Sequence, residues 1–146
     1  MYYECQKSAV ENLNMFVNSN RHSILVEGPE GCGKTFIAKE FARFKGIKDF
    51  SLVSPNVKEI RDTIDACYNV KNDIVLCIEN LDIGRAGASY ALLKFLEEPA
   101  DNIYIIVTCR NIYGIPDTII SRSTRISISN PTANDLGSYM RSIDLD

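Results

Sequence analysis

The segment from Gly28 to Thr35 holds the residues whose types and spacing could do chemistry. It reads GPEGCGKT, a complete G-x-x-x-x-G-K-[ST] loop. Glycines in such a loop let successive backbone N–H groups turn inward on a phosphate, and a following helix N-terminus adds partial positive charge. We expect Lys34 to reach the β- and γ-phosphates and the Thr35 hydroxyl to ligate Mg²⁺. The pattern predicts binding of a nucleoside triphosphate.

The flanking segments favour this interpretation over a glycine-rich turn with a coincidental Lys-Thr pair. The run Ile24–Val26 before the loop is short, apolar and typical of a buried parallel strand. The segment Thr35–Arg43 after it carries apolar residues at helical spacing. The loop therefore joins a strand to a helix, as its mechanism requires. The loop residues predicted to contact the nucleotide are Gly28, Pro29, Glu30, Gly31, Cys32, Gly33, Lys34, Thr35 and Phe36.

A second group of candidate residues follows Asp73–Ile78, which contains the most apolar continuous run and is the best candidate for a central strand. A phosphate-cleaving enzyme of this kind needs an acidic residue at the end of a second buried strand, near the Mg²⁺ shell. Glu79 stands there and can engage Mg²⁺ or its waters, unless it only caps the strand. Asn80 follows and is a poor general base, although its amide could orient a water. We expect nucleotide binding with weak or no intrinsic hydrolysis.

The elements that must position these residues alternate between helices and strands. Further strands are expected at Phe50–Val53, Ile103–Thr108 and Arg125–Ile128, and further helices at Ser8–Val17, from Asn56 to Ala66, Ala88–Glu98, Ile115–Ser121 and Thr132–Met140. Strands that are apolar throughout argue for a parallel sheet covered on both faces. We predict an α/β fold with three αβα layers and a ligand site at the carboxyl ends of the strands.

Composition places the chain among ordinary globular proteins. With 146 residues, 45% of them apolar and 24% charged, it fits one domain with a proper core. A net charge of −3 gives no sign of a nucleic-acid-coating protein, so DNA contacts would need a local patch or a larger assembly. No stretch approaches a membrane span, and the first residues lack a basic-then-apolar signal. We expect a cytoplasmic protein without membrane contacts.

The five cysteines are scattered and include no C-x-x-C pair, which argues for reduced thiols and against a zinc site. Cys32 differs from the others because the start of the loop helix would depress its thiol pKa. Two interpretations of Cys32 follow, a filler at a variable loop position or a redox-sensitive thiol.

Two further blocks resemble a known family. The block Ala88–Pro99, ASYALLKFLEEP, is similar to the L-L-K-x-L-E-E-P block of bacterial clamp-loader ATPases. The block Ile115–Ser123, IPDTIISRS, is similar to the one that ends in Ser-Arg-Cys in those proteins. Both follow the phosphate loop in the expected order, so the resemblance covers most of the chain from Ile24 to Ile128. Among DNA polymerase III clamp-loader subunits, delta-prime is most similar and gamma/tau second.

The resemblance implies an AAA+ fold and a part in DNA replication, in loading a ring-shaped sliding clamp onto primed DNA. It implies ATP and Mg²⁺ as cofactors. Other clamp-loader subunits, and through the assembly the clamp and primed DNA, are the implied partners. Arg122 matches the family's arginine finger, a guanidinium supplied to a neighbour's ATP site. The alternatives are an exposed surface arginine or confusion with nearby Arg125. The family's sensor residue corresponds to Thr108 first and to Asn111 second.

The chain departs from the family pattern in three places. Ser123 stands where cysteine is usual, and the four-cysteine zinc insertion after the loop helix is missing. The expected ATPase domain occupies residues 1–130, and residues 131–146 supply only the first helix of a lid. This would make the sequence either an excised domain or a naturally short protein, and a site without its lid should hold nucleotide weakly.

Three functions remain open at this point. The first is an ATP-binding clamp-loader module that communicates through Arg122. The second is a mainly structural, non-hydrolysing subunit that donates the finger, and the third is a small P-loop kinase or an unrelated AAA+ helper. Asn80 favours the second over the first, whereas the intact phosphate loop favours the first. The block at 92–99 and the Ser121-Arg122 pair count against the third.

Overall fold

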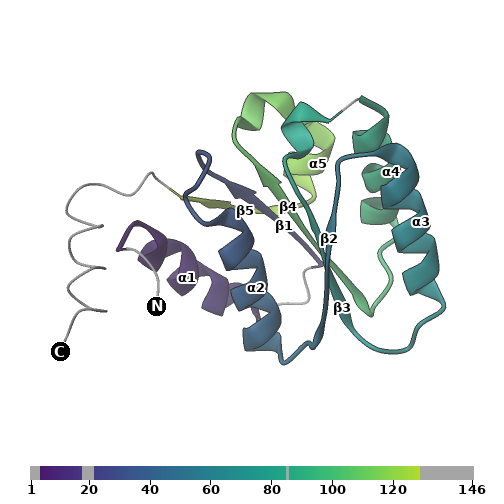
Figure 1. Ribbon diagram of the computed structural model, residues 1–146, viewed down its shortest axis with the longest axis horizontal. Coiled ribbons are helices and arrows are strands. Elements are labelled where there is room, and N and C mark those ends of the chain that lie inside the picture. The colour runs from purple at the N-terminus through teal and green to yellow at the C-terminus, as the bar shows by residue number, and fades with distance from the viewer. Residues whose placement is uncertain (1–3, 18–21, 85, 129–146) are drawn as a thin grey trace.

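The computed structural model describes residues 4–17, 22–84 and 86–128, and these form a sheet of five parallel strands between helices (Figure 1). The strands lie in the order β2-β3-β4-β1-β5. Each pairs in parallel with its neighbours, so all carboxyl ends meet at one edge. Their bounds are β1 Ser23–Glu27, β2 Asp49–Val53, β3 Ile74–Ile78, β4 Ile103–Cys109 and β5 Thr124–Ser127.

Helices cover both faces of this sheet. The helices α1 (Glu4–Val17) and α2 (Lys34–Lys45) lie on one face, and α3 (Val57–Tyr68) and α4 (Ala86–Glu97) lie on the other (Figure 1). The short helix α5 (Asp117–Ser121) packs on the α3–α4 side through Ile119. The predicted α/β fold with a parallel central sheet is confirmed. None of the described helices combines the length and the apolar character needed to cross a bilayer.

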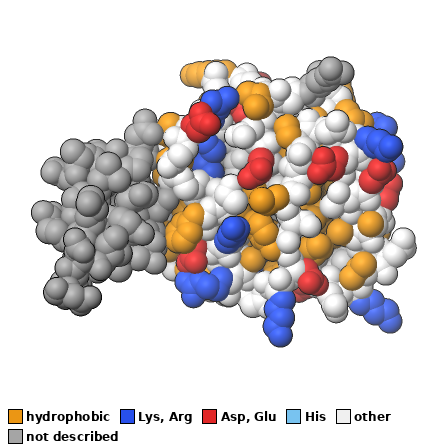
Figure 2. Space-filling view, in the orientation of Figure 1, with side chains coloured by type: hydrophobic (Ala, Val, Ile, Leu, Met, Phe, Trp, Pro, Cys, Tyr) orange, Lys and Arg blue, Asp and Glu red, His pale blue; other side chains and the backbone are white. Residues whose placement is uncertain are grey.

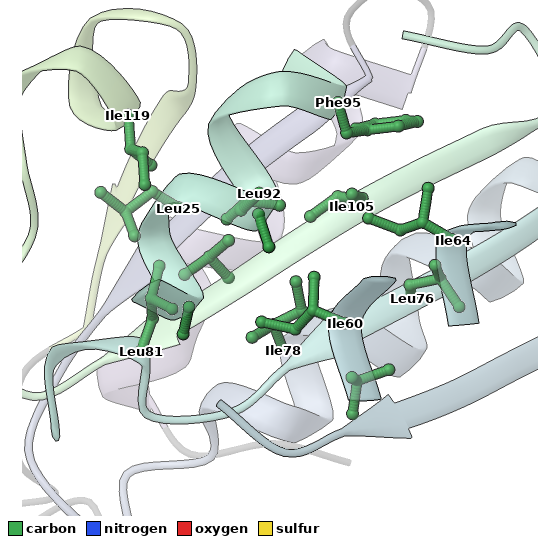
Figure 3. Close-up of a cluster of buried hydrophobic side chains, with 14 of the residues drawn as sticks. Leu25, Ile60, Ile64, Leu76, Ile78, Leu81, Leu92, Phe95, Ile105 and Ile119 are labelled. Atoms are coloured by element: carbon green, nitrogen blue, oxygen red, sulfur yellow. The ribbon is translucent and has the colours of Figure 1, made fainter. Parts of the chain in front are cut away.

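Alternate residues of the interior strands β1, β3 and β4 pack into two separate cores, which explains why these strands are largely apolar. The edge strands β2 and β5 are more polar and partly exposed. Leu76 and Ile105 face α3 and α4, where they pack with Leu92 and Phe95 (Figure 3). Val75 and Ile106 point to the opposite face and pack against α1 and α2. In β1, β3 and β4 both faces are buried, so a slip of one residue would move each side chain into the other core and disrupt the packing of both.

The element bounds differ from the predicted ones by at most two residues, except that α1 begins at Glu4 instead of the predicted Ser8. The helix α5 begins at Asp117 rather than at the predicted Ile115, because Pro116 biases Ile115 to extended backbone (φ −106°, ψ 129°). Two 3₁₀ turns, η1 (Leu81–Ile83) and η2 (Ile112–Gly114), were not predicted. The run at 74–78 is an interior strand, but the middle of the sheet is β4. The predicted helix Thr132–Met140 lies outside the described residues.

The thiols of Cys32, Cys67, Cys77 and Cys109 are buried. Burial raises the pKa of all four thiols, and it raises those of Cys77 and Cys109 to about 12. The expected depression of the Cys32 pKa is therefore wrong. Lys34 does lower that pKa, but loss of hydration on burial is the larger effect. Cys32 is a packed filler of the loop rather than an activated thiol.

Native-state alkylation tests this conclusion for each cysteine. A raised pKa shrinks the thiolate fraction at pH 7–8, and burial blocks access, so we expect iodoacetamide to modify Cys32, Cys77 and Cys109 at least about tenfold more slowly in the folded chain than in denaturant. Peptide mass spectrometry over time gives the rate at each site, with the denatured chain as control. Equal rates at Cys32 in both states would show that its thiol is accessible and ionised.

Candidate nucleotide site

The predicted phosphate loop opens onto a cavity of about 340 Å³. The cavity lies at the carboxyl ends of β1, β3 and β4, where parallel α/β sheets bind their ligands. Eight residues line it: Glu30, Gly31, Gly33, Lys34, Thr35, Glu79, Asn80 and Thr108. All eight were predicted from the sequence as nucleotide, metal or catalytic residues, and the fold gathers them from three separate segments.

Close packing sets the shape of the loop. The Gly28 N–H donates to the Cys109 carbonyl (3.0 Å), which ties the loop to the end of β4. A Cβ at Gly28 would lie 2.6 Å from Cys32 Sγ and 2.9 Å from the Ile128 carbonyl oxygen, so only glycine fits. Gly33 has φ 93°, a left-handed conformation suited to glycine, and precedes α2 without any side-chain cap. The helix N-terminus therefore faces the cavity, as an anion site requires.

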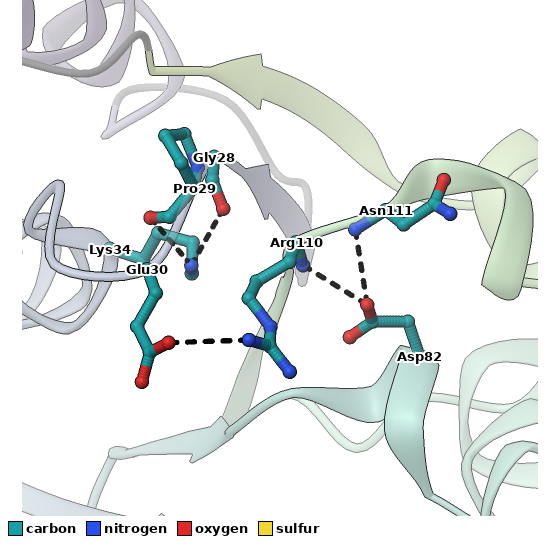
Figure 4. A network of polar contacts seen from close by, with 7 residues as sticks. All are labelled: Gly28, Pro29, Glu30, Lys34, Asp82, Arg110 and Asn111. Carbon is teal, nitrogen blue, oxygen red and sulfur yellow. Dashed lines mark hydrogen bonds and ion pairs between the residues drawn. The ribbon is translucent and has the colours of Figure 1, made fainter.

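The Lys34 side chain is buried and folds back along the loop. Its Nζ donates to the carbonyl oxygens of Gly28 (2.7 Å) and Pro29 (3.1 Å), as Figure 4 shows. A buried ammonium needs such partners, and here the loop's own backbone supplies them. Two neutral carbonyl oxygens are weaker partners for the ammonium than a phosphate would be. Lys34 is thus held beside the loop in a position from which it can exchange ligands.

Thr35 and Glu79 face each other across the cavity. The Thr35 hydroxyl donates to Glu79 Oε1 over 3.1 Å. One hydroxyl and one carboxylate suit Mg²⁺, which binds hard oxygen ligands and keeps waters and phosphate oxygens in its other positions. The described residues contain no cluster of three or more His, Cys, Asp or Glu that could hold a metal by itself. This donor set therefore fits a metal that arrives with a nucleotide.

Asn80 adopts an unusual backbone conformation. Its φ of 52° and ψ of 50° are left-handed, and it is the one non-glycine residue with positive φ in the described ranges. Asparagine tolerates this region better than most residues, which is a structural reason for an amide at this position. The Asn80 N–H donates to Thr108 Oγ1 (3.0 Å). Thr108 lines the cavity, and a hydroxyl that accepts one hydrogen bond can also donate one.

Asn111, the second sensor candidate, lies outside the cavity lining. Its Oδ1 accepts from the Tyr113 N–H (3.0 Å) and caps η2. Asp82, which lies in η1, fixes the segment between β4 and η2. Its Oδ2 accepts hydrogen bonds from the N–H groups of Arg110 (3.3 Å) and Asn111 (3.1 Å). Sequence reasoning missed this role of Asp82, for which the only signal is an acidic residue close behind Glu79.

Two arginines follow α5, and their side chains differ in how firmly they are held. Arg122 lies at the end of α5, with Nη1 donating to the Thr118 carbonyl (3.0 Å) and Nη2 at 3.9 Å from Glu97 Oε1. Arg125 donates to Glu27 Oε1 over 2.6 Å, and this bond raises the pKa of Arg125. Neither lines the cavity. Arg125 is held by its short ion pair with Glu27 of β1, whereas the ion pair of Arg122 with Glu97 is longer.

Two predicted loop residues, Pro29 and Phe36, support the site from outside the cavity lining. Pro29 accepts hydrogen bonds from Lys34 and from the Cys32 N–H (3.3 Å). Phe36 is partly buried against the core on the α1–α2 face of the sheet. Glu30 pairs with Arg110, whose Nη1 lies 3.3 Å from Glu30 Oε2. Arg110 was not predicted, since its place beside the loop depends on the pairing of β1 with β4.

Comparison with known proteins gives consistent matches. DNA polymerase III subunit tau of Bacillus subtilis (strain 168) is 30% identical over 84% of this chain, and subunit gamma of Buchnera aphidicola is 27% identical over the same share. The chain spans 27% and 42% of their lengths. A DNA polymerase III gamma subunit-related protein of Thermotoga maritima has the same fold, with a TM-score of 0.74 and 21% identity over 91% of this chain and 49% of its own.

The family model that matches is described as DNA polymerase III, delta subunit. It covers residues 48–132, from just before β2 to beyond β5, and so takes in Glu79, Thr108 and Arg122. This is more than half of the 146 residues. The chain therefore belongs to the DNA polymerase III delta subunit family and is homologous to the tau and gamma subunits.

Proposed function

We propose that this chain is the ATP-binding module of a sliding-clamp loader in DNA replication, with weak or no hydrolysis of its own. The observation that carries the proposal is the convergence of Lys34, Thr35, Glu79 and Thr108 on one cavity behind an intact phosphate loop. The DNA polymerase III subunits among its relatives support the replication role. We further propose that residues 1–130 are an AAA+ ATPase domain, with the delta-prime subunit as the nearest type. The lid helix expected within 131–146 lies outside the described residues.

Each group of site residues has its own part in binding the phosphates. The loop N–H groups and the N-terminus of α2 receive the phosphate chain. Lys34 exchanges the Gly28 and Pro29 carbonyls for phosphate oxygens. Thr35 and Glu79 would hold Mg²⁺, which would neutralise part of the phosphate charge. Thr108 continues to accept the hydrogen bond from the Asn80 N–H and donates a hydrogen bond from its hydroxyl to the terminal phosphate.

A second candidate is a structural subunit that binds little nucleotide and acts on its neighbour. Arg122 favours it, because its side chain is 40% exposed and lies outside this chain's own cavity. A guanidinium placed there can stabilise charge on a phosphoryl group in an adjacent subunit. Both candidates have other clamp-loader subunits as partners, act in the cytoplasm, and meet the clamp and primed DNA through the assembly. Figure 2 shows acidic and basic side chains interspersed on the visible face, which gives no separate reason to propose DNA binding by this face alone.

Calorimetric titration with ATP and Mg²⁺ tests nucleotide binding. Lys34→Ala should weaken the affinity about tenfold to a hundredfold, since it removes charge-assisted hydrogen bonds to phosphate. Lys39→Ala is the matched control, because Lys39 is an exposed lysine on the same helix, and it should bind like the unaltered chain. Binding that survives Lys34→Ala at full strength would contradict the assigned site, and no binding by the unaltered chain would leave only the structural subunit.

Phosphate release tests the claim of weak hydrolysis. Asn80 cannot accept a proton from water, so turnover should be slow, and Asn80→Asp should raise it, by up to about a hundredfold, by supplying a carboxylate. Asn80→Gly is the control, because glycine keeps the left-handed backbone and adds no base. Rapid turnover by the unaltered chain that persists in Asn80→Gly would show that the site is catalytically complete without this residue.

The finger assignment is tested in a reconstituted clamp loader with primed DNA. Arg122→Ala should leave this chain's own ATP affinity unchanged. It should slow hydrolysis in the neighbouring subunit by about a thousandfold, which is typical of the loss of an arginine finger. Arg125→Ala separates the two arginines, since Arg125 is engaged with Glu27. If Arg125→Ala slows the neighbour and Arg122→Ala does not, the assignment passes to Arg125.

A further inference from the structure

Arg110 is a cation beside the phosphate loop to which the proposed function gives no role. It follows β4 directly, and the register sets Cys109 opposite Glu27, so Arg110 comes level with Gly28. The Gly28 N–H bond to the Cys109 carbonyl locks this alignment. The Arg110 N–H donates to Asp82 Oδ2 (3.3 Å). Its backbone is therefore held from both sides at the rim of the site.

The Arg110 side chain crosses from β4 to the loop. Its Nη1 lies 3.3 Å from Glu30 Oε2, and Figure 4 shows the guanidinium between the loop and Asp82. Glu30 lines the cavity, whereas Arg110 is not among the lining residues. The arginine therefore contacts the loop's carboxylate rather than the cavity itself.

Glu30 is an unfavourable residue for an anion site. Glu30 lines the cavity proposed to receive a polyphosphate, and its negative charge would repel a polyanion bound there. Lys34, the cation within the loop itself, donates to the carbonyl oxygens of Gly28 and Pro29 rather than to Glu30. Among the described residues, Glu30 forms its ion pair with Arg110.

We propose that Arg110 is a positioning residue that neutralises Glu30 and draws its carboxylate to the rim, so that the loop admits a polyphosphate. This rests on the proposed nucleotide site and deepens it. The effect acts through Glu30 and not through direct contact with phosphate. The side chains of Arg110 and Glu30 are 43% and 85% exposed, so solvent screens the pair. Loss of Arg110 should cost about twofold to fivefold in affinity at low ionic strength.

A double-mutant cycle tests the coupling, with Arg110→Ala, Glu30→Gln and the double variant titrated with Mg-ATP and with inorganic tripolyphosphate. Arg110→Ala should weaken binding of both ligands about twofold to fivefold in the unaltered chain, and less than twofold in the Glu30→Gln background. Arg110→Lys should restore most of the loss, because charge rather than fork geometry is required. The difference should fade in about 1 M salt. Thermal unfolding of each variant checks that the fold is retained.

Each other outcome overturns the inference. An equal loss from Arg110→Ala in both backgrounds would mean that the arginine meets phosphate directly. No loss in either background would mean that the ion pair is incidental. If the unaltered chain binds neither ligand, the proposed nucleotide site fails and this inference with it. Binding of both ligands without coupling between the two substitutions defeats the inference alone.

Discussion

The parallel pairing of β1 with β4 is the interaction on which the candidate site depends. Their register continues past the strands into the bond between the Gly28 N–H and the Cys109 carbonyl. Through this pairing the phosphate loop, Thr108 and Arg110 lie side by side although some eighty residues separate them in the chain. The alignment is rigid because side chains from both strands are buried on both faces of the sheet.

Within the site several polar groups already have hydrogen-bond partners in the same chain. Lys34 bonds to loop carbonyls, Thr35 bonds to Glu79, and Asn80 bonds to Thr108. Partners of this kind keep the groups in place at little cost, since the bonds are ordinary in strength and can be exchanged for stronger bonds to phosphate. The left-handed backbone of Asn80 has a similar role, because it brings the Asn80 N–H to the Thr108 hydroxyl.

Cys32 shows how burial can reverse an expectation based on local sequence. The start of α2 and the nearby Lys34 charge both favour a thiolate, and on these grounds a reactive cysteine was a reasonable alternative. The thiol is instead packed with no exposed surface, beneath Gly28 and next to the core on the α1–α2 face. Loss of hydration then outweighs the attraction to Lys34, and the pKa rises.

Local pattern was enough to predict the phosphate loop, the five strands and most helices, because apolar periodicity and glycine spacing are properties of neighbouring residues. The left-handed Asn80, the cap made by Asn111 and the bonds of Asp82 were decided only by the tertiary structure. So was the approach of Arg110 to Glu30. Each of these depends on which strand ends lie next to each other, and strand order follows from packing across the whole sheet rather than from any short segment.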